Sequence, residues 1–173
     1  MGIKANRAVF LDRDGIFNQV VFRSGKPNYS PRNWSEVIHE KGLGILKEIK
    51  SRGFYLIMVT NQPDLERGLV SPEFVQSLND YYKKTYDLDA IYMCPYSSNE
   101  HPEKKPNPGM LLRAARDFGL ELNSCYFIGD TERDMLAASR CGCHFILYDR
   151  NYNKELKAPV RINSLGALPE NII

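Results

Sequence analysis

Short apolar runs that alternate with helical segments constrain this chain of 173 residues more than any other feature. Each run is bounded by turn residues or by an amphipathic stretch, as is typical of a strand buried on both faces. The runs cover residues 7–11, 55–60, 90–94, 124–128 and 144–147. Buried strands separated by helices predict an α/β fold, with a parallel sheet of about five strands and helices on both faces.

Helix signals fill the intervals between these runs. Ser71 before Pro72 is typical of a helix start, and Gly53 and Gly119 are placed to end helices. We expect helices over residues 39–52, 71–86, 108–118 and 132–140. We interpret residues 19–35 and 94–107 as long loops and the chain from residue 151 onward as an irregular finish.

Composition narrows the classes of function. Lys and Arg number 23 against 21 Asp and Glu, a net charge of +2, so bulk charge favours neither nucleic acid nor a membrane as partner. No apolar run approaches the roughly 20 residues of a membrane span, and the N-terminal stretch lacks the pattern of a secretory signal. We expect a cytoplasmic enzyme.

Acidic side chains follow two of the predicted strands. Asp12 and Asp14 come directly after the first, and Asp130 and Asp134 after the fourth. Because parallel strands bind ligands at their carboxyl ends, these carboxylates are expected to converge. Carboxylates gathered at one point suit an oxygen-preferring cation, and Mg²⁺ is the usual choice beside phosphate.

Groups that suit phosphate lie at the ends of other strands. Lys104 and Lys105 precede a helix, where the neighbouring prolines stiffen the backbone, and Thr60 and Asn61 end the second strand. Their ammonium, hydroxyl and amide groups can donate to phosphate oxygens. Taken singly, a solvated basic loop and an ordinary Thr-Asn turn remain open as interpretations.

Four motifs in chain order resemble the haloacid dehalogenase (HAD) superfamily of phosphatases from about Arg7 to Tyr148. They read FLDRDGIFN, VTNQ, KPNPGM and GDTERDM. The first three, with TNQPDLERG around the second, look like the branch that holds the heptose-bisphosphate and histidinol-phosphate phosphatases. This resemblance implies a Rossmann-like HAD fold. The intervals between the motifs leave no room for a cap domain, so we expect one HAD-like domain over residues 1–173.

The resemblance assigns roles residue by residue. It implies that Asp12 is the nucleophile that forms an aspartyl-phosphate and that Asp14 is the general acid and base. It implies that Thr60 and Lys105 hold the phosphoryl group. It implies that Mg²⁺ is bound by Asp12, Asp130 and the backbone carbonyl of Asp14. The residues expected to contact substrate are Asn18, Thr60, Asn61, Gln62, Arg67, Lys104 and Lys105.

Three departures from the family pattern bear on these expectations. Ile16 stands where a threonine is usual, and Lys104 where an arginine often precedes the motif lysine. The loop that binds structural zinc in many heptose-branch members keeps only Cys94 here, with His101 as a second candidate ligand. Structural zinc needs four ligands, so we expect none at this loop.

The expected function is Mg²⁺-dependent hydrolysis of a small phosphomonoester, with a sugar bisphosphate such as D-glycero-D-manno-heptose 1,7-bisphosphate as the leading substrate. Histidinol phosphate is an alternative. A phosphotransferase or phosphomutase of the same superfamily is another, and so is a non-catalytic descendant that binds a phosphorylated ligand. Retention of both Asp12 and Asp14 favours an enzyme.

Overall fold

Six parallel strands form one sheet in the computed structural model, which describes residues 6–173 apart from the side chain of Asn28. The strands are β1 (Ala8–Leu11), β4 (Tyr55–Asn61), β5 (Ala90–Cys94), β6 (Tyr126–Gly129), β7 (His144–Tyr148) and β8 (Val160–Ile162). The predicted parallel sheet is confirmed, with all five expected strands present. The sixth strand, β8, lies in the tail that the sequence pattern had indicated to be irregular. The first five residues of the expected single domain lie outside the described part.

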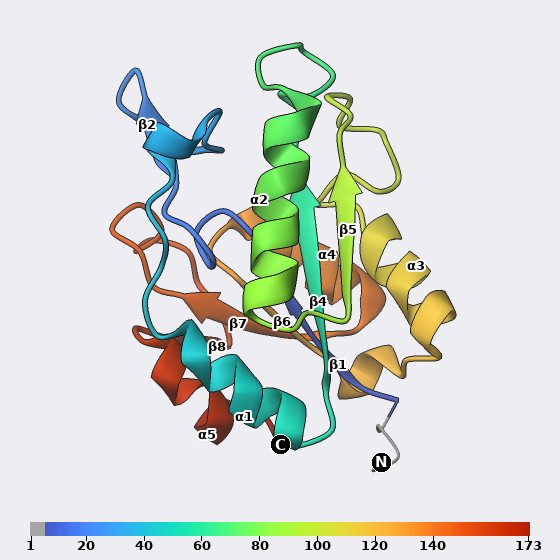
Figure 1. Ribbon diagram of the computed structural model, residues 1–173. Coiled ribbons are helices and arrows are strands. Elements are labelled where there is room, and N and C mark those ends of the chain that lie inside the picture. Colours follow the sequence, from blue (N-terminus) through green and yellow to red (C-terminus); the bar gives the residue numbers. More distant parts are fainter. Residues whose placement is uncertain (1–5) are drawn as a thin grey trace.

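The order of the strands, β5-β4-β1-β6-β7-β8, places β1 in the middle of the sheet. The chain builds outward from β1 through β4 to β5, then returns to the other side of β1 for β6, β7 and β8 (Figure 1). The carboxyl end of β1 is therefore the point at which the strand order reverses. Open α/β sheets bind their ligands at such a point.

Side chains of the central strands alternate between two hydrophobic cores, one on each face of the sheet. Val9 and Leu11 enter one core, which contains side chains from residues 46–51, 72–85 and 168–171, whereas Ala8 and Phe10 enter the other, with side chains from residues 109–118 and 132–141. This alternation follows from the two-residue period of a strand. The helices are α1 (Leu46–Ser51), α2 (Pro72–Thr85), α3 (Gly109–Phe118), α4 (Glu132–Cys141) and α5 (Leu168–Asn171).

Local signals in the sequence explain where the helices begin. The Ser71 side chain accepts a hydrogen bond from the Phe74 amide, which caps α2 at the predicted position. The helix expected over residues 39–52 is shorter than predicted. Gly42 adopts a left-handed backbone with φ of 82°, a 3-10 turn follows over Leu43–Ile45, and α1 begins only after it.

The segment over residues 19–35, predicted to be a loop, contains an antiparallel hairpin of β2 (Val21–Arg23) and β3 (Lys26–Tyr29). Arg23 pairs with Glu36 at 2.7 Å, which ties the hairpin to the 3-10 turn Trp34–Glu36. The strands are short and irregular in register, so they carry little of the apolar alternation by which strands are recognised in sequence. The hairpin stands beyond one end of the sheet (Figure 1).

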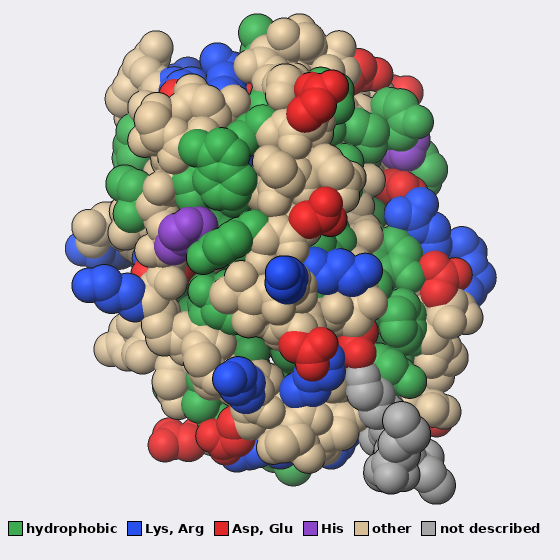
Figure 2. Space-filling view, in the orientation of Figure 1, with side chains coloured by type: hydrophobic (Ala, Val, Ile, Leu, Met, Phe, Trp, Pro, Cys, Tyr) green, Lys and Arg blue, Asp and Glu red, His purple; other side chains and the backbone are tan. Residues whose placement is uncertain are grey.

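Within residues 6–173, no helix has the length and apolar character needed to cross a membrane. On the face of the molecule shown in Figure 2, basic and acidic side chains are interspersed, with no continuous basic stripe.

Candidate active site

The carboxyl ends of three central strands and the loop after β5 bring the predicted motif residues together. Asp12 follows β1, Thr60 and Asn61 end β4, and Asp130 follows β6. Lys105 reaches the same place from the loop that links β5 to α3. The convergence expected from the parallel sheet is therefore present in the structure.

Three carboxylates meet at the centre of this site. Ligand atoms of Asp12, Asp130 and Asp134 all lie within 4.8 Å of one another, and all three residues are buried. The Lys105 ammonium bridges two of them, at 2.8 Å from Asp12 Oδ1 and 2.7 Å from Asp134 Oδ1. One ammonium faces three carboxylates, so the cluster favours a further cation.

Two glycines permit this close approach. A Cβ on Gly15 would lie 2.1 Å from Asp130 Oδ2, and a Cβ on Gly129 would lie 2.5 Å from Asp134 Cβ. Gly15 also has a positive φ of 95°, which other residues rarely adopt. These positions accept no side chain while the carboxylates keep their places.

Asp130 is held from the C-terminal part of the chain. The Tyr152 hydroxyl donates to Asp130 Oδ2, and the Asn153 amide donates to the Asp130 backbone carbonyl at 2.8 Å. Asp130 Oδ1 is buried and has no hydrogen-bond partner among the described residues. Burial and the nearby Asp134 raise the pKa of Asp130 to about 7. A bound cation would offset both effects.

Asp12 has similar surroundings. Burial raises its pKa well above the ordinary value, Asp134 and Asp130 add to this, and Lys105 opposes it. Burial lowers the pKa of Lys105, but the two carboxylates that it bridges outweigh this and raise it, so the lysine is held as an ammonium. The nucleophile candidate and the phosphoryl-binding candidate are thus already paired.

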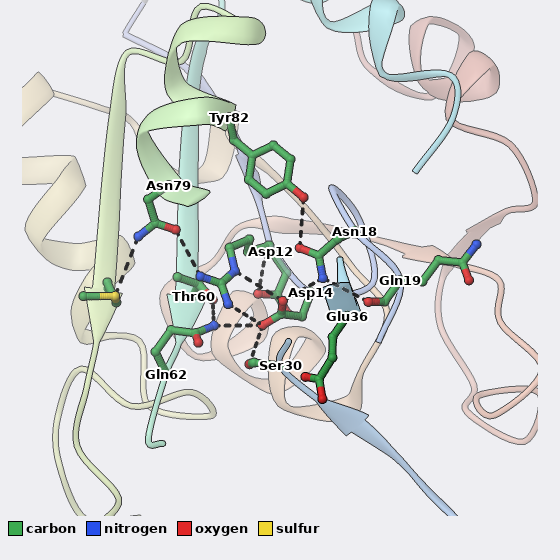
Figure 3. Close-up of polar contacts among 12 residues, drawn as sticks. Asp12, Asp14, Asn18, Gln19, Ser30, Glu36, Thr60, Gln62, Asn79 and Tyr82 are labelled. Atoms are coloured by element: carbon green, nitrogen blue, oxygen red, sulfur yellow. Dashed lines mark hydrogen bonds and ion pairs between the residues drawn. The ribbon is translucent and has the colours of Figure 1, made fainter. Parts of the chain in front are cut away.

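Asp14 lies two residues from Asp12 but is surrounded by donors (Figure 3). Its carboxylate accepts hydrogen bonds from Ser30 Oγ at 2.6 Å, Gln62 Nε2 at 2.8 Å and Asn18 Nδ2 at 2.9 Å, and it also pairs with Arg13. Burial alone would raise its pKa, but Arg13, Ser30 and Asn18 outweigh it and lower the pKa.

The backbone of Lys105 is fixed by a reciprocal pair of hydrogen bonds. Asn61 Nδ2 donates to the Lys105 carbonyl at 2.9 Å, and the Lys105 amide donates to Asn61 Oδ1 at 3.0 Å. The Lys105 ammonium also donates to the carbonyl of Val59 at 3.1 Å. Asn61 therefore positions the lysine and ties the loop after β5 to the end of β4.

The other predicted residues differ in how they face the site. Asn18 and Gln62 are buried, and both are turned toward Asp14. Thr60 is buried and accepts from Gln62 Nε2 at 3.0 Å. Arg67 and Lys104 line a larger cavity beside the cluster, but the Lys104 ammonium is bound to the Ser97 carbonyl and to Asn99 Oδ1.

Sequence reasoning missed several residues of this site. Arg13 was seen only as the residue between two aspartates, yet it is fully buried and pairs with Asp14. Its position was a usable signal, because an arginine between two aspartates directly after a buried strand has acidic partners within reach and is not part of a polar surface segment. Ser30 and Tyr152 lie in segments with no motif, so nothing in the sequence marked them. Arg133 lines the site from within the fourth motif.

The loop after β5 brings Cys94 and His101 together, with Cys94 Sγ at 3.8 Å from His101 Nδ1. Among the described residues, these two have no third Cys, His, Asp or Glu placed to share a metal. The loop is closed by Lys104 and by Asn107, whose amide donates to the carbonyls of Asn99 and His101. The absence of structural zinc stays a prediction.

Comparison with known proteins places the chain in a family. A HAD-hydrolase-like family matches residues 103–162. The D-glycero-β-D-manno-heptose-1,7-bisphosphate 7-phosphatase of Helicobacter pylori is 33% identical over 144 residues, covering 78% of this chain and 79% of that protein. The enzyme of the same name from Photorhabdus laumondii is 31% identical over 183 aligned residues, which cover 95% of this chain and 94% of that protein.

A solved structure agrees with the sequence relatives. The D,D-heptose 1,7-bisphosphate phosphatase of B. bronchiseptica, complexed with magnesium and phosphate, superposes with a TM-score of 0.80. It is 25% identical and covers 95% of this chain and 97% of its own. Fold, site and relatives together define a HAD-type hydrolase that acts on phosphoric monoesters. Within that class, the chain belongs to the family of the heptose-bisphosphate phosphatases. The resemblance predicted from the four motifs is confirmed.

Proposed function

We propose that this chain is a Mg²⁺-dependent phosphatase that hydrolyses a sugar bisphosphate of the D-glycero-D-manno-heptose 1,7-bisphosphate type. The observation that carries the chemistry is the Lys105 ammonium, which bridges Asp12 and Asp134 next to the unpartnered Asp130 Oδ1. The substrate rests on the relatives, which are named for this heptose bisphosphate.

The residues fit a magnesium ion. Asp130 Oδ1 is a buried carboxylate oxygen with no partner in the described chain, and Asp12 contributes a second carboxylate within reach. Oxygen ligands of this type are those that Mg²⁺ prefers. We assign Asp12, Asp130 and the backbone carbonyl of Asp14 as its ligands. Asp134, whose Oδ1 is occupied by Lys105, orients that lysine. When bound, the ion neutralises charge on the phosphoryl oxygens.

In the first step, a carboxylate oxygen of Asp12 attacks phosphorus and the bond from phosphorus to the sugar oxygen breaks. The departing oxygen takes the proton of Asp14, and Asp12 becomes an aspartyl-phosphate. Lys105 and Thr60 hold the phosphoryl oxygens. Lys105 is already within 2.8 Å of Asp12 Oδ1, so the nucleophile and the phosphoryl-binding cation need no rearrangement to meet.

In the second step, a water oxygen attacks phosphorus and the bond from phosphorus to Asp12 breaks. Asp14 takes the proton of that water, which returns it to the protonated form and releases phosphate. The donors around Asp14 favour its carboxylate, the form that the second step needs. The first step needs the protonated form, which the negative charge of a bound phosphate favours.

Residues around these two aspartates complete the proposal. Asn18 and Gln62 orient Asp14, Asn61 positions Lys105, and Arg67 and Lys104 lie on the side where the rest of the substrate extends. We propose one HAD-like domain over residues 1–173, located in the cytoplasm, with a small phosphorylated sugar as its partner and neither nucleic acid nor a membrane.

Phosphate release across a panel of esters tests the proposal. With Mg²⁺, the enzyme should hydrolyse heptose 1,7-bisphosphate with a higher kcat/KM than histidinol phosphate or an aryl phosphate, and EDTA should abolish turnover. Preference for histidinol phosphate would contradict the substrate, and phosphate transfer to a sugar acceptor in place of water would contradict hydrolysis. Elemental analysis of protein purified without chelator should show no stoichiometric zinc.

A further inference from the structure

A larger cavity opens directly from the catalytic site. A cavity of about 60 Å³ is lined by Asp12, Asp14 and Lys105, and one of about 490 Å³ lies next to it. Ser30, Asn61 and Arg133 line both, so the two are continuous. A substrate whose phosphoryl group meets Asp12 therefore extends into the larger cavity, between the β2–β3 hairpin and the loop after β5.

The larger cavity carries an excess of positive charge. Its lining includes the cations Lys26, Arg67, Lys104 and Arg133 and a single acid, Asp64. Asp64 is bound at 2.9 Å by Arg32, which is not part of the lining. An anionic group is the ligand that this wall favours.

The four cations are not equally available. The Lys104 ammonium is used inside its own loop, and Lys104 is only 5% exposed. The Arg67 guanidinium forms an ion pair with Asp64, with 3.5 Å between its nitrogen and Asp64 Oδ1. The side chains of Arg133 and Lys26 make no hydrogen bond or ion pair with any residue that the structure describes, and of the four cations Arg133 alone also lines the catalytic cavity. Its guanidinium is free at the junction of the two cavities.

We propose that Arg133 is a specificity-determining residue that binds the second phosphate of the substrate while the first is transferred to Asp12. This inference rests on the proposed function and extends it. A guanidinium matches a phosphate through two parallel hydrogen bonds, which an ammonium cannot form. Arg133 is adjacent in sequence to Asp134, which Lys105 contacts, so its backbone is fixed relative to the catalytic cluster. The second phosphate is thus recognised at a set distance from the first.

The test compares a bisphosphate with a phosphate ester that has no second anionic group. Steady-state kinetics on heptose 1,7-bisphosphate and p-nitrophenyl phosphate are measured for the wild type, Arg133→Ala, Arg133→Lys and Arg116→Ala. Arg116 is an exposed arginine on α3 that lines neither cavity, so its removal controls for loss of charge alone. The bisphosphate kcat/KM of Arg133→Ala should fall by roughly 10- to 100-fold, mainly through KM, because one charge-assisted contact is lost.

For the aryl phosphate, kcat/KM should change by less than about threefold in Arg133→Ala, because the groups that bind the transferred phosphate are still present. Arg133→Lys should recover part of the loss, and Arg116→Ala should match the wild type. Suppose that the wild type prefers the bisphosphate. Equal losses of kcat/KM on both substrates in Arg133→Ala, or no loss on either, would then overturn the role of Arg133 but not the proposed substrate. A wild type that hydrolyses the aryl phosphate and shows no preference for the bisphosphate would overturn the proposed substrate, and this inference with it.

Discussion

Asp12 and Asp14 are separated by one residue, yet their surroundings are opposite. Asp12 lies in a crowded group of carboxylates with Lys105 as its balancing cation, and burial with these neighbours raises its pKa. Asp14 is bound by Arg13, Asn18, Ser30 and Gln62, and its pKa is lowered. Environments that shift the pKa values of two carboxyl groups in opposite directions suit the two groups to different roles in a reaction. On the Asp12 side one ammonium faces three carboxylates, a deficit of positive charge that a bound metal ion would offset, whereas Asp14 is fully surrounded by donors.

Removal of the proposed nucleophile, Asp12, should have the largest effect. Asp12→Asn should lower kcat by roughly 10,000-fold or more, because an amide is a poor nucleophile and a weaker metal ligand. The isosteric change should leave the fold intact, which circular dichroism and a melting curve will verify. Phosphatase activity close to wild type in the folded variant would rule out the covalent mechanism.

Asp14→Asn should reduce the rates of both chemical steps by about 1,000-fold, since general acid–base catalysis contributes on that scale. Mg²⁺ binding should be retained, because only the backbone carbonyl of Asp14 is assigned to the metal. Rapid-quench kinetics separate formation of the aspartyl-phosphate from its hydrolysis. Normal rates for both steps would remove Asp14 from the acid–base role.

Tyr152→Phe tests whether a residue that contacts Asp130 affects the binding of Mg²⁺. The Tyr152 hydroxyl donates to Asp130 Oδ2, and residues that orient a metal ligand affect metal affinity by about 10-fold or more. Isothermal titration with Mg²⁺ should show a weaker Kd, whereas Tyr96→Phe, which removes an exposed hydroxyl elsewhere, should not. Unchanged affinity in Tyr152→Phe would show that Asp130 is held sufficiently by Asn153 and its own strand.

Ser30→Ala should have the smallest effect. It removes one donor from Asp14 and leaves three other side chains in place, so kcat should fall by about three- to tenfold. Ser35→Ala, in the same segment but bonded to Asn33, is the matched control. A loss as large as that of Asp14→Asn would mean that Ser30 contacts the substrate itself.

The same contrast explains what the sequence could reveal. The sheet and its helices follow from apolar runs and capping residues that are local in sequence, and the strand ends of a parallel sheet must meet at one edge. The positions of Asp12, Asp130 and Lys105 were therefore predictable. Asp12 and Asp130 are motif residues that directly follow strands, and Lys105 belongs to a motif that precedes α3.

The partners of Asp14 and the lining of the larger cavity were harder to predict. Ser30 reaches Asp14 from beyond the hairpin, whose short irregular strands leave no periodic signal. Tyr152 depends on the path of the chain between β7 and β8, and turn-forming residues such as Asn151 and Asn153 mark a turn there without fixing which side chain points to the site. The direction of a long side chain is also invisible in sequence. Lys104 turns into its own loop, and Arg133 is left free.

Two hydrogen bonds connect the turn that follows β1 to helix α2. The Arg13 guanidinium donates to Asn79 Oδ1 at 3.1 Å, and the Tyr82 hydroxyl donates to Asn18 Oδ1 at 3.3 Å. Arg13 and Asn18 in turn bind Asp14, so two of its four side-chain partners are themselves held by α2. Opening of α2 would break both contacts and expose the core side chains that this helix shares with the sheet. The packing of a helix outside the four motifs therefore bears on how firmly the turn after β1 is held.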